Sequence, residues 1–225
     1  MSAFEVIVFD YDGTLFDTRP AIVHCIQRAF AECGRPVPAL AGVTGTVKTG
    51  LPLPDTLLIL DDGLRDDQAA LDKLVETYRT LYLDEATPLA KPFSGVRDTL
   101  RKLHANGAKC VVVSNKGIAA IRRSLDQNQL SSFVDLVFGD QPGFPKKPDP
   151  AIFTDHILPR YARWQRQQIL MVGDTEIDIL FAKAAGISSC WASYGYGEVE
   201  HCRRLEPDHE ISSIAELLAL ALADR

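Results

Sequence analysis

The chain has 225 residues, of which 46% are hydrophobic and 24% are charged, a composition that excludes disordered and fibrous proteins. The formal net charge of -6, with no block of Lys and Arg, argues against nucleic acid as a partner, because binding the phosphate backbone requires a basic surface. No apolar run approaches the roughly 18 residues that a membrane span needs, and the N-terminal segment has no basic stretch, so we expect a soluble, cytoplasmic protein with no membrane partner.

Short apolar runs alternate with segments of helical periodicity along most of the chain. The runs are rich in Val, Ile or Phe without a strict apolar–polar alternation, as is typical of strands that are covered on both faces. We expect strands at Phe4–Phe9, Cys110–Val113, Val134–Phe138, Ile169–Val172 and Ser189–Ala192. Helices are expected at Gly95–Asn106, Ile118–Asn128, Ile177–Ala185 and Ser213–Ala223. This alternation predicts an α/β fold with a doubly wound, Rossmann-like parallel sheet.

One region interrupts the alternation. Between the first strand and Phe93 the sequence shows no convincing strand, and glycines and prolines separate three helical patterns. The helices are predicted at Ala21–Cys33, Asp55–Leu60 and Asp66–Asp84, with a loop over 42–54. We therefore expect residues 17–91 to form an inserted, all-helical cap on a core made of residues 1–16 and 92–225. The expected hinges are Asp17–Pro20 and Pro88–Pro92.

Polar residues follow the predicted strands, at the edge where a doubly wound sheet binds its ligands. Three groups come directly after a strand, and a fourth, which contains Lys147, lies farther along the chain. The three groups are Asp10 with Asp12, Ser114 with Asn115, and Asp174 with Asp178. Because the carboxyl ends of parallel strands meet at one edge, we expect all four groups to lie close together.

The aspartates of this set favour a divalent cation. Asp10 and Asp12 in one crevice would repel each other, and Asp174 adds a third carboxylate. Hard oxygen ligands favour Mg²⁺, which keeps positions open for water and phosphate. Lys147 can supply a further positive charge, and Ser114 with nearby backbone N–H groups can hold phosphate oxygens. Each group alone has a common structural explanation, such as an acidic turn or a helix cap, but the four together indicate a site for a phosphate ester.

The set resembles the motifs of the haloacid dehalogenase-like hydrolase superfamily. The resemblance is carried by DYDGT at Asp10–Thr14, Ser114 with Asn115, Lys147 in KPDP, and GDTEID at Gly173–Asp178. The motifs occur in the same order and span nearly the whole chain, and the insert after the first motif is similar to the superfamily's small helical cap. Further segments are similar to those of phosphoglycolate phosphatase-like members, namely Gly50–Leu53, Ala182–Ile187 and Tyr194–Gly197.

The resemblance implies that Asp10 is the nucleophile that attacks phosphorus and is also a magnesium ligand. Asp12 would protonate the leaving oxygen and then activate water, and its backbone carbonyl would bind magnesium. The dehalogenases of the superfamily lack a carboxylate at this position, so the presence of Asp12 favours phosphate-ester chemistry. The implied reaction is the Mg²⁺-dependent hydrolysis of a small, phosphoglycolate-like phosphomonoester through a phospho-aspartyl intermediate on Asp10.

The other matched residues would act on the phosphoryl group or on the metal. Ser114 and Asn115 would hold the phosphoryl group, and Lys147 would neutralise the charge that this group shares with the nucleophile. Asp174 would bind magnesium. Asp178 would act from farther out, on the metal-bound waters or on Lys147.

Two adjacent lysines precede Pro148, and only one of them can occupy the site. Since Lys147 directly precedes the proline, as in the family motif, we expect it to point inward. Lys146 is then expected to be exposed to solvent.

The cap is expected to select the substrate. Three short helices enclose little volume, so the substrate should be a small phosphorylated metabolite. Gly50 and Leu51 precede the short second helix, where glycine permits close approach of the backbone and a helix N-terminus favours an anion. If the substrate carries a carboxylate, this loop is its expected place, with Lys48 or Arg19 as partners. The alternative is that the loop only caps the helix.

Other functions can use the same motifs. A sugar phosphomutase has the same motifs and cap type, and a pyrophosphatase or a nucleotidase would take pyrophosphate or a nucleoside monophosphate instead. A non-enzymatic alternative is a phospho-acceptor signalling module, although such receiver domains carry no large insert after the first strand. The sequence leaves open whether the protein is a monomer or a homodimer.

Overall fold

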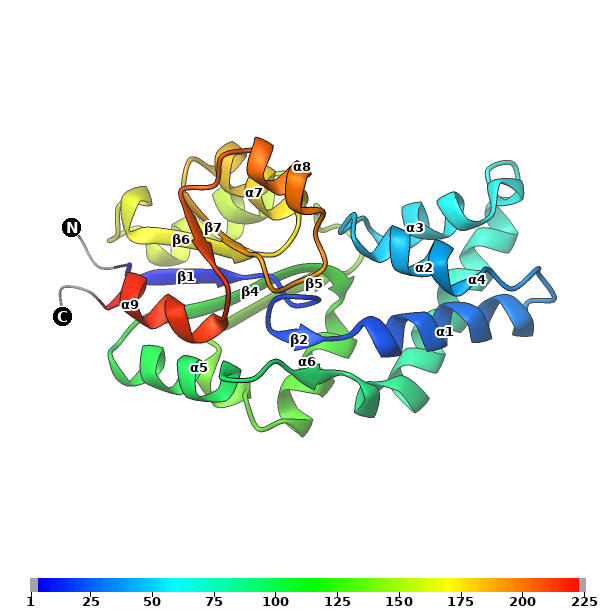
Figure 1. Ribbon diagram of the computed structural model, residues 1–225, viewed down its shortest axis with the longest axis horizontal. Coiled ribbons are helices and arrows are strands. Elements are labelled where there is room, and N and C mark those ends of the chain that lie inside the picture. Colours follow the sequence, from blue (N-terminus) through cyan, green and yellow to red (C-terminus); the bar gives the residue numbers. More distant parts are fainter. Residues whose placement is uncertain (1–3, 223–225) are drawn as a thin grey trace.

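The computed structural model describes residues 4–222, whose core is a six-stranded parallel sheet with the order β5-β4-β1-β6-β7-β8 (Figure 1). The strands are β1 (Val6–Phe9), β4 (Lys109–Gly117), β5 (Leu136–Asp140), β6 (Ile169–Gly173), β7 (Ser188–Ala192) and β8 (His209–Ile211). The five expected strands are confirmed with small shifts at their ends. The strand β8 was not expected, because its three residues include the polar His209 and Glu210 and show no apolar run. It lies at the edge of the sheet, where polar residues are tolerated.

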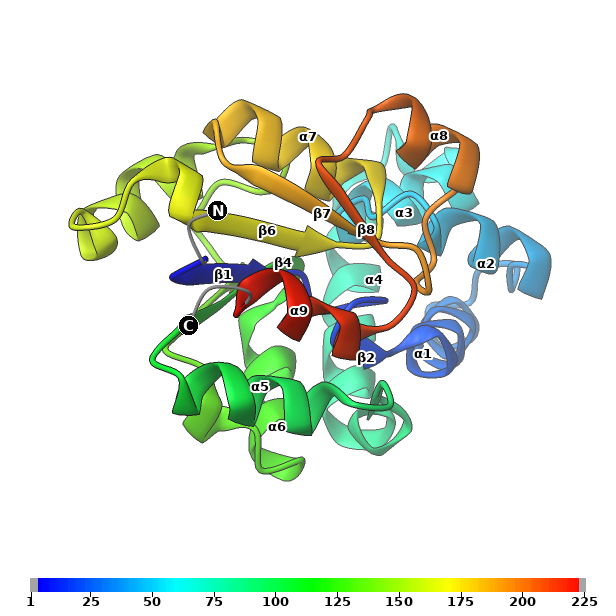
Figure 2. The same cartoon turned by 60° about the vertical axis from the view of Figure 1, so that its left-hand side comes forward.

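Helices cover both faces of this sheet, as Figure 2 shows. One face carries α5 (Val96–Ala105), α6 (Ile118–Gln127) and α9 (Leu217–Ala221). The other face carries α7 (Glu176–Ala185), α8 (Val199–Arg204) and the π-helical turn Ile152–Ile157. Within β1, Ile7 and Phe9 belong to the first apolar cluster, whereas Val6 and Val8 belong to the second. Burial on both sides explains why the strand reads as an unbroken apolar run and confirms the α/β fold.

Four helices, rather than the expected three, lie between β1 and α5. They are α1 (Arg19–Glu32), α2 (Leu40–Val47), α3 (Leu53–Leu60) and α4 (Gln68–Leu81), and we call them the helical segment. The additional helix, α2, occupies part of the expected loop. It was not expected because Gly42 and Gly45 lower the intrinsic helix propensity of this segment. Burial of Val43 and Thr46 against its neighbours stabilises it instead, which shows tertiary packing overriding local preference.

Two expected helices differ from the prediction, one at its end and the other at its start. The chain leaves α4 at Leu81 and continues as a π-helical turn over Tyr82–Ala86, where a regular helix was expected up to Asp84. Near the C-terminus, a 3₁₀ turn at Ile214–Glu216 precedes α9. The last residue of the expected helix there, Ala223, lies outside the described residues.

The two connections of the helical segment to the core run side by side. The short strands β2 (Phe16–Asp17) and β3 (Lys91–Pro92) pair antiparallel, with Asp17 opposite Lys91. Strands of two residues are too short to give a periodic signal, so neither was expected. The pair overlaps the segments expected to be hinges at Asp17 and at Lys91–Pro92.

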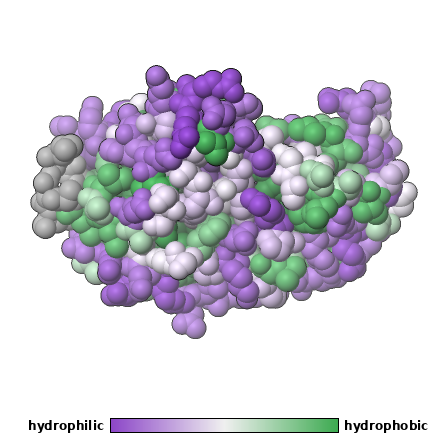
Figure 3. Space-filling model, in the orientation of Figure 1, coloured by the Kyte–Doolittle hydropathy of each residue, from purple (hydrophilic) through white to green (hydrophobic). Residues whose placement is uncertain are grey.

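The surface is mixed in polarity. Figure 3 shows a mostly hydrophilic face with separate hydrophobic patches, some of them over the helical segment. Exposed apolar side chains of that segment include Leu40 and Ile59. Within residues 4–222, no helix combines the length and the apolar character needed to cross a lipid bilayer.

Candidate active site

The carboxyl end of β1 is the point where the strand order changes direction. The chain leaves β1 for β4 and β5 on one side and returns to β6 on the other side of β1. Parallel sheets bind ligands in the crevice that such a reversal creates. Asp10 follows β1 directly, Asp174 follows β6 directly, and Ser114 lies near the end of β4. The sheet topology therefore brings together residues that are far apart in the sequence.

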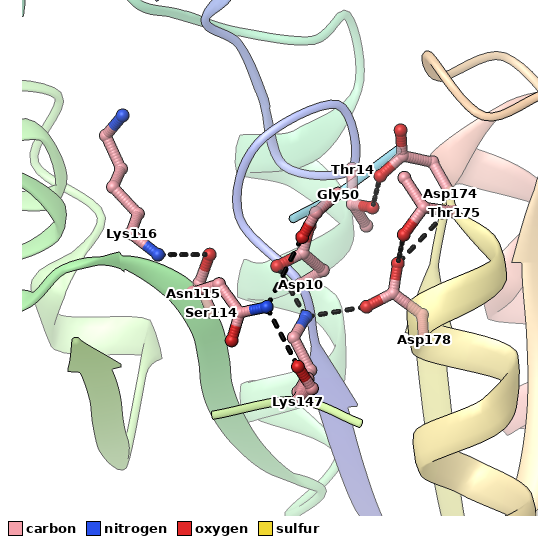
Figure 4. Close-up of polar contacts among 10 residues, drawn as sticks. All are labelled: Asp10, Thr14, Gly50, Ser114, Asn115, Lys116, Lys147, Asp174, Thr175 and Asp178. Atoms are coloured by element: carbon pink, nitrogen blue, oxygen red, sulfur yellow. Dashed lines mark hydrogen bonds and ion pairs between the residues drawn. The ribbon is translucent and has the colours of Figure 1, made fainter. Parts of the chain in front are cut away.

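Lys147 is the buried cation of this crevice. Its side-chain nitrogen Nζ donates to Asp10 Oδ1 at 2.7 Å and to Asp178 Oδ1 at 2.6 Å (Figure 4). Burial disfavours the charged lysine, but the two carboxylates outweigh this effect and raise the pKa of Lys147. The neighbouring Lys146 lies 3.2 Å from Asp140 with one third of its side chain exposed, so it is partly buried instead of fully exposed.

Hydrogen bonds fix the orientation of the carboxylates of Asp178 and Asp174. Asp178 Oδ2 accepts from the backbone N–H of Thr175 at 3.0 Å and from its hydroxyl at 2.9 Å, at the first turn of α7. Asp174 Oδ1 accepts from the Thr14 hydroxyl at 2.9 Å, and its Oδ2 accepts from the backbone N–H of Tyr196 at 2.7 Å. Such partners hold side chains in one rotamer, as a site with defined geometry requires.

Three carboxylates crowd together in this crevice. Asp10, Asp174 and Asp178 each place an oxygen so that all three lie within 4.8 Å of one another. Burial raises the pKa of Asp10 to about 7, even though Lys147 opposes the shift. Burial, together with the charges of Asp10 and Asp178, also raises the pKa of Asp174. When all three are ionised, three negative charges face the single positive charge of Lys147 and leave a net charge of -2.

These residues fit a divalent cation, because its charge would balance that excess and its preferred ligands are hard oxygens. The carboxylate of Asp12 does not join the crowded group. It lies 3.2 Å from the ammonium of Lys116, so a contribution of Asp12 to a metal would have to come from its backbone carbonyl, as expected from the resemblance. Gly13, at φ +82°, allows the loop after β1 to run close to Asp174, since a Cβ at this position would lie 2.2 Å from Asp174 Oδ2.

The two residues expected to hold a phosphoryl group differ in what they can offer. Ser114 is buried, and its oxygen accepts a long hydrogen bond of 3.4 Å from the backbone N–H of Lys116, which leaves the hydroxyl proton to donate. The side-chain amide of Asn115 instead donates to the carbonyls of Gly50, at 3.3 Å, and of Lys147, at 3.1 Å. Asn115 therefore joins the helical segment to the loop that carries the buried lysine.

A cavity lies between this crevice and the helical segment. It is lined by Asp10, Asp12, Ser114, Asn115, Lys147 and Asp178 from the core and by Gly50 and Leu51 from the segment. Its volume is about 120 Å³, which is room for about four water molecules at the density of liquid water. The cavity thus suits a small ligand, with the expected loop at its wall.

The expected basic partners in the helical segment lie elsewhere. Lys48 pairs with Glu198 at 3.1 Å, and the guanidinium of Arg19 lies 4.3 Å from the centroid of the Tyr196 ring, so neither lines the cavity. Arg79 and Lys116 line it instead. Lys116 directly follows the second motif, a signal that could have identified it. Arg79 reads as an ordinary exposed residue of a helix, and nothing in the sequence marks it.

Tyr196 connects the hinge of the helical segment to the crevice. Its hydroxyl donates to Asp17 Oδ1 at 2.6 Å and accepts from the backbone N–H of Thr18 at 2.7 Å. Its own backbone N–H donates to Asp174 Oδ2. One residue thus contacts both the base of the segment and a carboxylate of the site.

Comparison with known proteins finds relatives along nearly the whole chain. The family model described as haloacid dehalogenase-like hydrolase matches residues 7–192. A phosphoglycolate phosphatase from Pseudomonas putida is 33% identical over 98% of this chain and 83% of its own length. A phosphoglycolate phosphatase from Vibrio parahaemolyticus is 32% identical over 95% of this chain and 94% of its own length.

Solved structures share the fold. A haloacid dehalogenase-like family hydrolase from Streptococcus pneumoniae superposes with a TM-score of 0.81 at 25% identity, covering 97% of this chain and 99% of its own. A Haemophilus somnus protein, described as a predicted phosphoglycolate phosphatase, superposes with a TM-score of 0.83 at 25% identity, covering 97% of this chain and 98% of its own.

Proposed function

The chain belongs to the haloacid dehalogenase-like hydrolase family, and from this premise we propose that it is a Mg²⁺-dependent phosphatase that hydrolyses a small phosphomonoester. The observation that carries the proposal is the buried group of Asp10, Lys147, Asp174 and Asp178 at the point where the strand order reverses. The phosphoglycolate phosphatases among its relatives support the same chemistry and a small substrate.

Asp10 is the proposed nucleophile. Its carboxylate attacks phosphorus, so that a bond from Asp10 to phosphorus forms as the bond to the ester oxygen breaks. Asp12 gives its proton to the leaving oxygen and afterwards takes a proton from the water that hydrolyses the phospho-aspartyl group. Lys147, 2.7 Å from Asp10, offsets the negative charge that builds up on the carboxylate and the phosphoryl group. The Ser114 hydroxyl donates to a phosphoryl oxygen.

Asp10, Asp174 and the backbone carbonyl of Asp12 are the proposed magnesium ligands, with Asp178 next to them. When bound, Mg²⁺ supplies positive charge that offsets the charges of the carboxylates and the phosphate. Chelation should therefore abolish phosphate release, and added Mg²⁺ should restore it. Mg²⁺ should also raise the melting temperature of the wild type, since a ligand that binds only the folded state stabilises it. Full activity in excess chelator would contradict this assignment.

We also propose that residues 17–91 act as a cap over the cavity, on a core of residues 1–16 and 92–225. The cavity between the two supports this, and so does the Asn115–Gly50 hydrogen bond across it. Closing the cap would exclude water other than the attacking molecule. The small volume of the cavity favours a small phosphorylated metabolite over a nucleotide.

The test of the function is a phosphate-release assay over a panel of phosphorylated metabolites, with and without Mg²⁺. Release of inorganic phosphate from small phosphomonoesters is expected. Retention of the phosphate on a rearranged product would indicate a phosphomutase instead. A stable phosphoprotein formed once per chain, without turnover, would indicate a signalling module.

The variant Asp12→Asn should lose about 10²- to 10⁴-fold in kcat on an alkyl phosphate, because it keeps the nucleophile but lacks proton transfer. The loss should be smaller with an activated aryl phosphate, whose leaving oxygen needs little protonation. Steady-state kinetics on the two substrates measure the difference. An equal loss on both would mean that Asp12 does not protonate the leaving group.

A further inference from the structure

A second group of donors lines the cavity at a distance from Lys147. Arg79 and Tyr82 come from the helical segment and the turn that follows it, and Lys116 comes from the end of β4. In Figure 4 the side chain of Lys116 points away from Asp10 and Lys147. The proposed phosphoryl chemistry uses none of these three residues. Lys116 touches that chemistry only through its ion pair with Asp12.

Lys116 is a buried ammonium with incomplete compensation. Its side chain is only 6% exposed, and Nζ lies 3.2 Å from Asp12 Oδ1 and 3.7 Å from the centroid of the Tyr82 ring. Burying a cation is costly unless acceptors surround it. A lysine has three N–H donors, so one carboxylate and one ring face leave room for a further acceptor from the cavity.

Tyr82 contributes a hydroxyl without a partner. The residue is 1% exposed, it lines the cavity, and among the described residues its hydroxyl finds no hydrogen-bond partner. Burial raises the pKa of Tyr82, so the hydroxyl stays protonated and can donate. Since buried polar groups are nearly always satisfied, a ligand oxygen or a water is the expected partner.

Arg79 stands at the more open side of the cavity, with 48% of its side chain exposed. Its Nη2 donates to Asp140 Oδ2 at 2.5 Å, and Asp140 Oδ1 also receives Lys146 at 3.2 Å. A guanidinium has five N–H donors, so this single bond leaves several that can reach a ligand. Of the charged residues that line this part of the cavity, Arg79 pairs with Asp140 and Lys116 pairs with Asp12, so the charges balance while N–H donors of both cations remain unused.

We propose that Arg79, Lys116 and Tyr82 form a subsite for a second anionic group of the substrate, a carboxylate on a short phosphomonoester. The unused N–H donors of Arg79 and Lys116 and the unpartnered hydroxyl of Tyr82 are complementary to a carboxylate, whose two oxygens accept hydrogen bonds. The inference rests on the proposed phosphatase function and adds to it the residues that would recognise the second group of the substrate. It also replaces Lys48 and Arg19 as the partners of that carboxylate.

The experiment compares two substrates of the same length, 2-phosphoglycolate and 2-hydroxyethyl phosphate, in which a hydroxymethyl group replaces the carboxylate. The wild type should prefer the first in kcat/KM. Arg79→Gln should lower kcat/KM for 2-phosphoglycolate about 10- to 100-fold through KM, the range expected for a charged hydrogen bond. The same variant should change kcat/KM for 2-hydroxyethyl phosphate, which lacks the carboxylate, less than about 3-fold.

Tyr82→Phe tests the same subsite with little risk to folding. It keeps the ring against Lys116 and removes only the hydroxyl. The preference for 2-phosphoglycolate should fall about 3- to 10-fold, as for a neutral hydrogen bond. A melting curve of each variant verifies that it is folded.

Two controls separate substrate binding from attachment of the helical segment. Asp140→Asn breaks the ion pair of Arg79 but leaves the guanidinium in place, so the carboxylate preference should persist. Arg28→Gln removes an arginine of α1 that pairs with Glu32 and Glu85 outside the cavity, and both substrates should react as with the wild type.

The outcomes that overturn the inference differ from the failure of the proposed function. Equal losses on both substrates in Arg79→Gln and Asp140→Asn would mean that Arg79 only holds the segment against the core. A wild type without preference would exclude the subsite and leave the phosphatase proposal intact. No release of phosphate from either substrate or from an aryl phosphate would instead contradict the phosphatase function itself.

Discussion

Replacing Asp10 by asparagine should abolish phosphate release and should prevent any phosphorylated enzyme from forming. The amide is nearly the same size as the carboxylate but is not a nucleophile, so the first step has no attacking group. Removing a nucleophile costs about 10⁴-fold or more in kcat. Steady-state turnover measures the loss, and rapid quenching with a labelled substrate shows whether the chain carries phosphate.

The variant is expected to remain folded, because Lys147 keeps its bond of 2.6 Å to Asp178 when Asp10 loses its charge. Asp98→Asn is a suitable control, since it makes the same replacement at an exposed position of α5, outside the cavity. It should retain wild-type activity. Ordinary turnover by Asp10→Asn would mean that a different group attacks phosphorus and that the mechanism is wrong.

The fold was predictable where the sequence pattern records burial. Val6, Val8 and the residues between and after them are apolar because both faces of β1 are covered, and this apolar run is sufficient to identify the strand. Prediction failed where stability comes from distant contacts. The helix α2 contains Gly42 and Gly45 and is held by packing, and β8 forms because its backbone pairs with β7. Neither leaves a periodic signal in its own residues.

The candidate site was predictable to a similar extent and for a related reason. Asp10 and Asp174 follow strands directly, so the rule that ligands bind at the carboxyl edge of the sheet places them together. The residues that complete the cavity could not be identified in this way. Arg79 depends on how the helical segment sits against β5, and that contact joins residues 61 positions apart. A prediction from local pattern therefore chose Lys48 and Arg19, which lie near the expected loop and hinge but do not line the cavity.

The adjacent lysines should differ sharply when each is replaced by alanine. Lys147→Ala should be nearly inactive, because the ammonium that offsets charge on Asp10 and the phosphoryl group is lost. It should also be less stable by about 3–5 kcal/mol in the absence of metal, since Asp10 and Asp178 are then buried without their cation. Activity must therefore be measured below the melting temperature of the variant, which a thermal unfolding curve provides.

Lys146→Ala is the matched control one residue away. Its ammonium is partly exposed and lies 3.2 Å from Asp140, which keeps Arg79 as a partner when the lysine is removed. A partly exposed pair of this kind contributes about 0–1 kcal/mol, so activity and stability should stay close to wild type. If Lys146→Ala is inactive and Lys147→Ala is not, the loop before Pro148 presents the other lysine to the site. If both are fully active on an alkyl phosphate, the charge on Asp10 is offset without either lysine, and the role proposed for Lys147 is wrong.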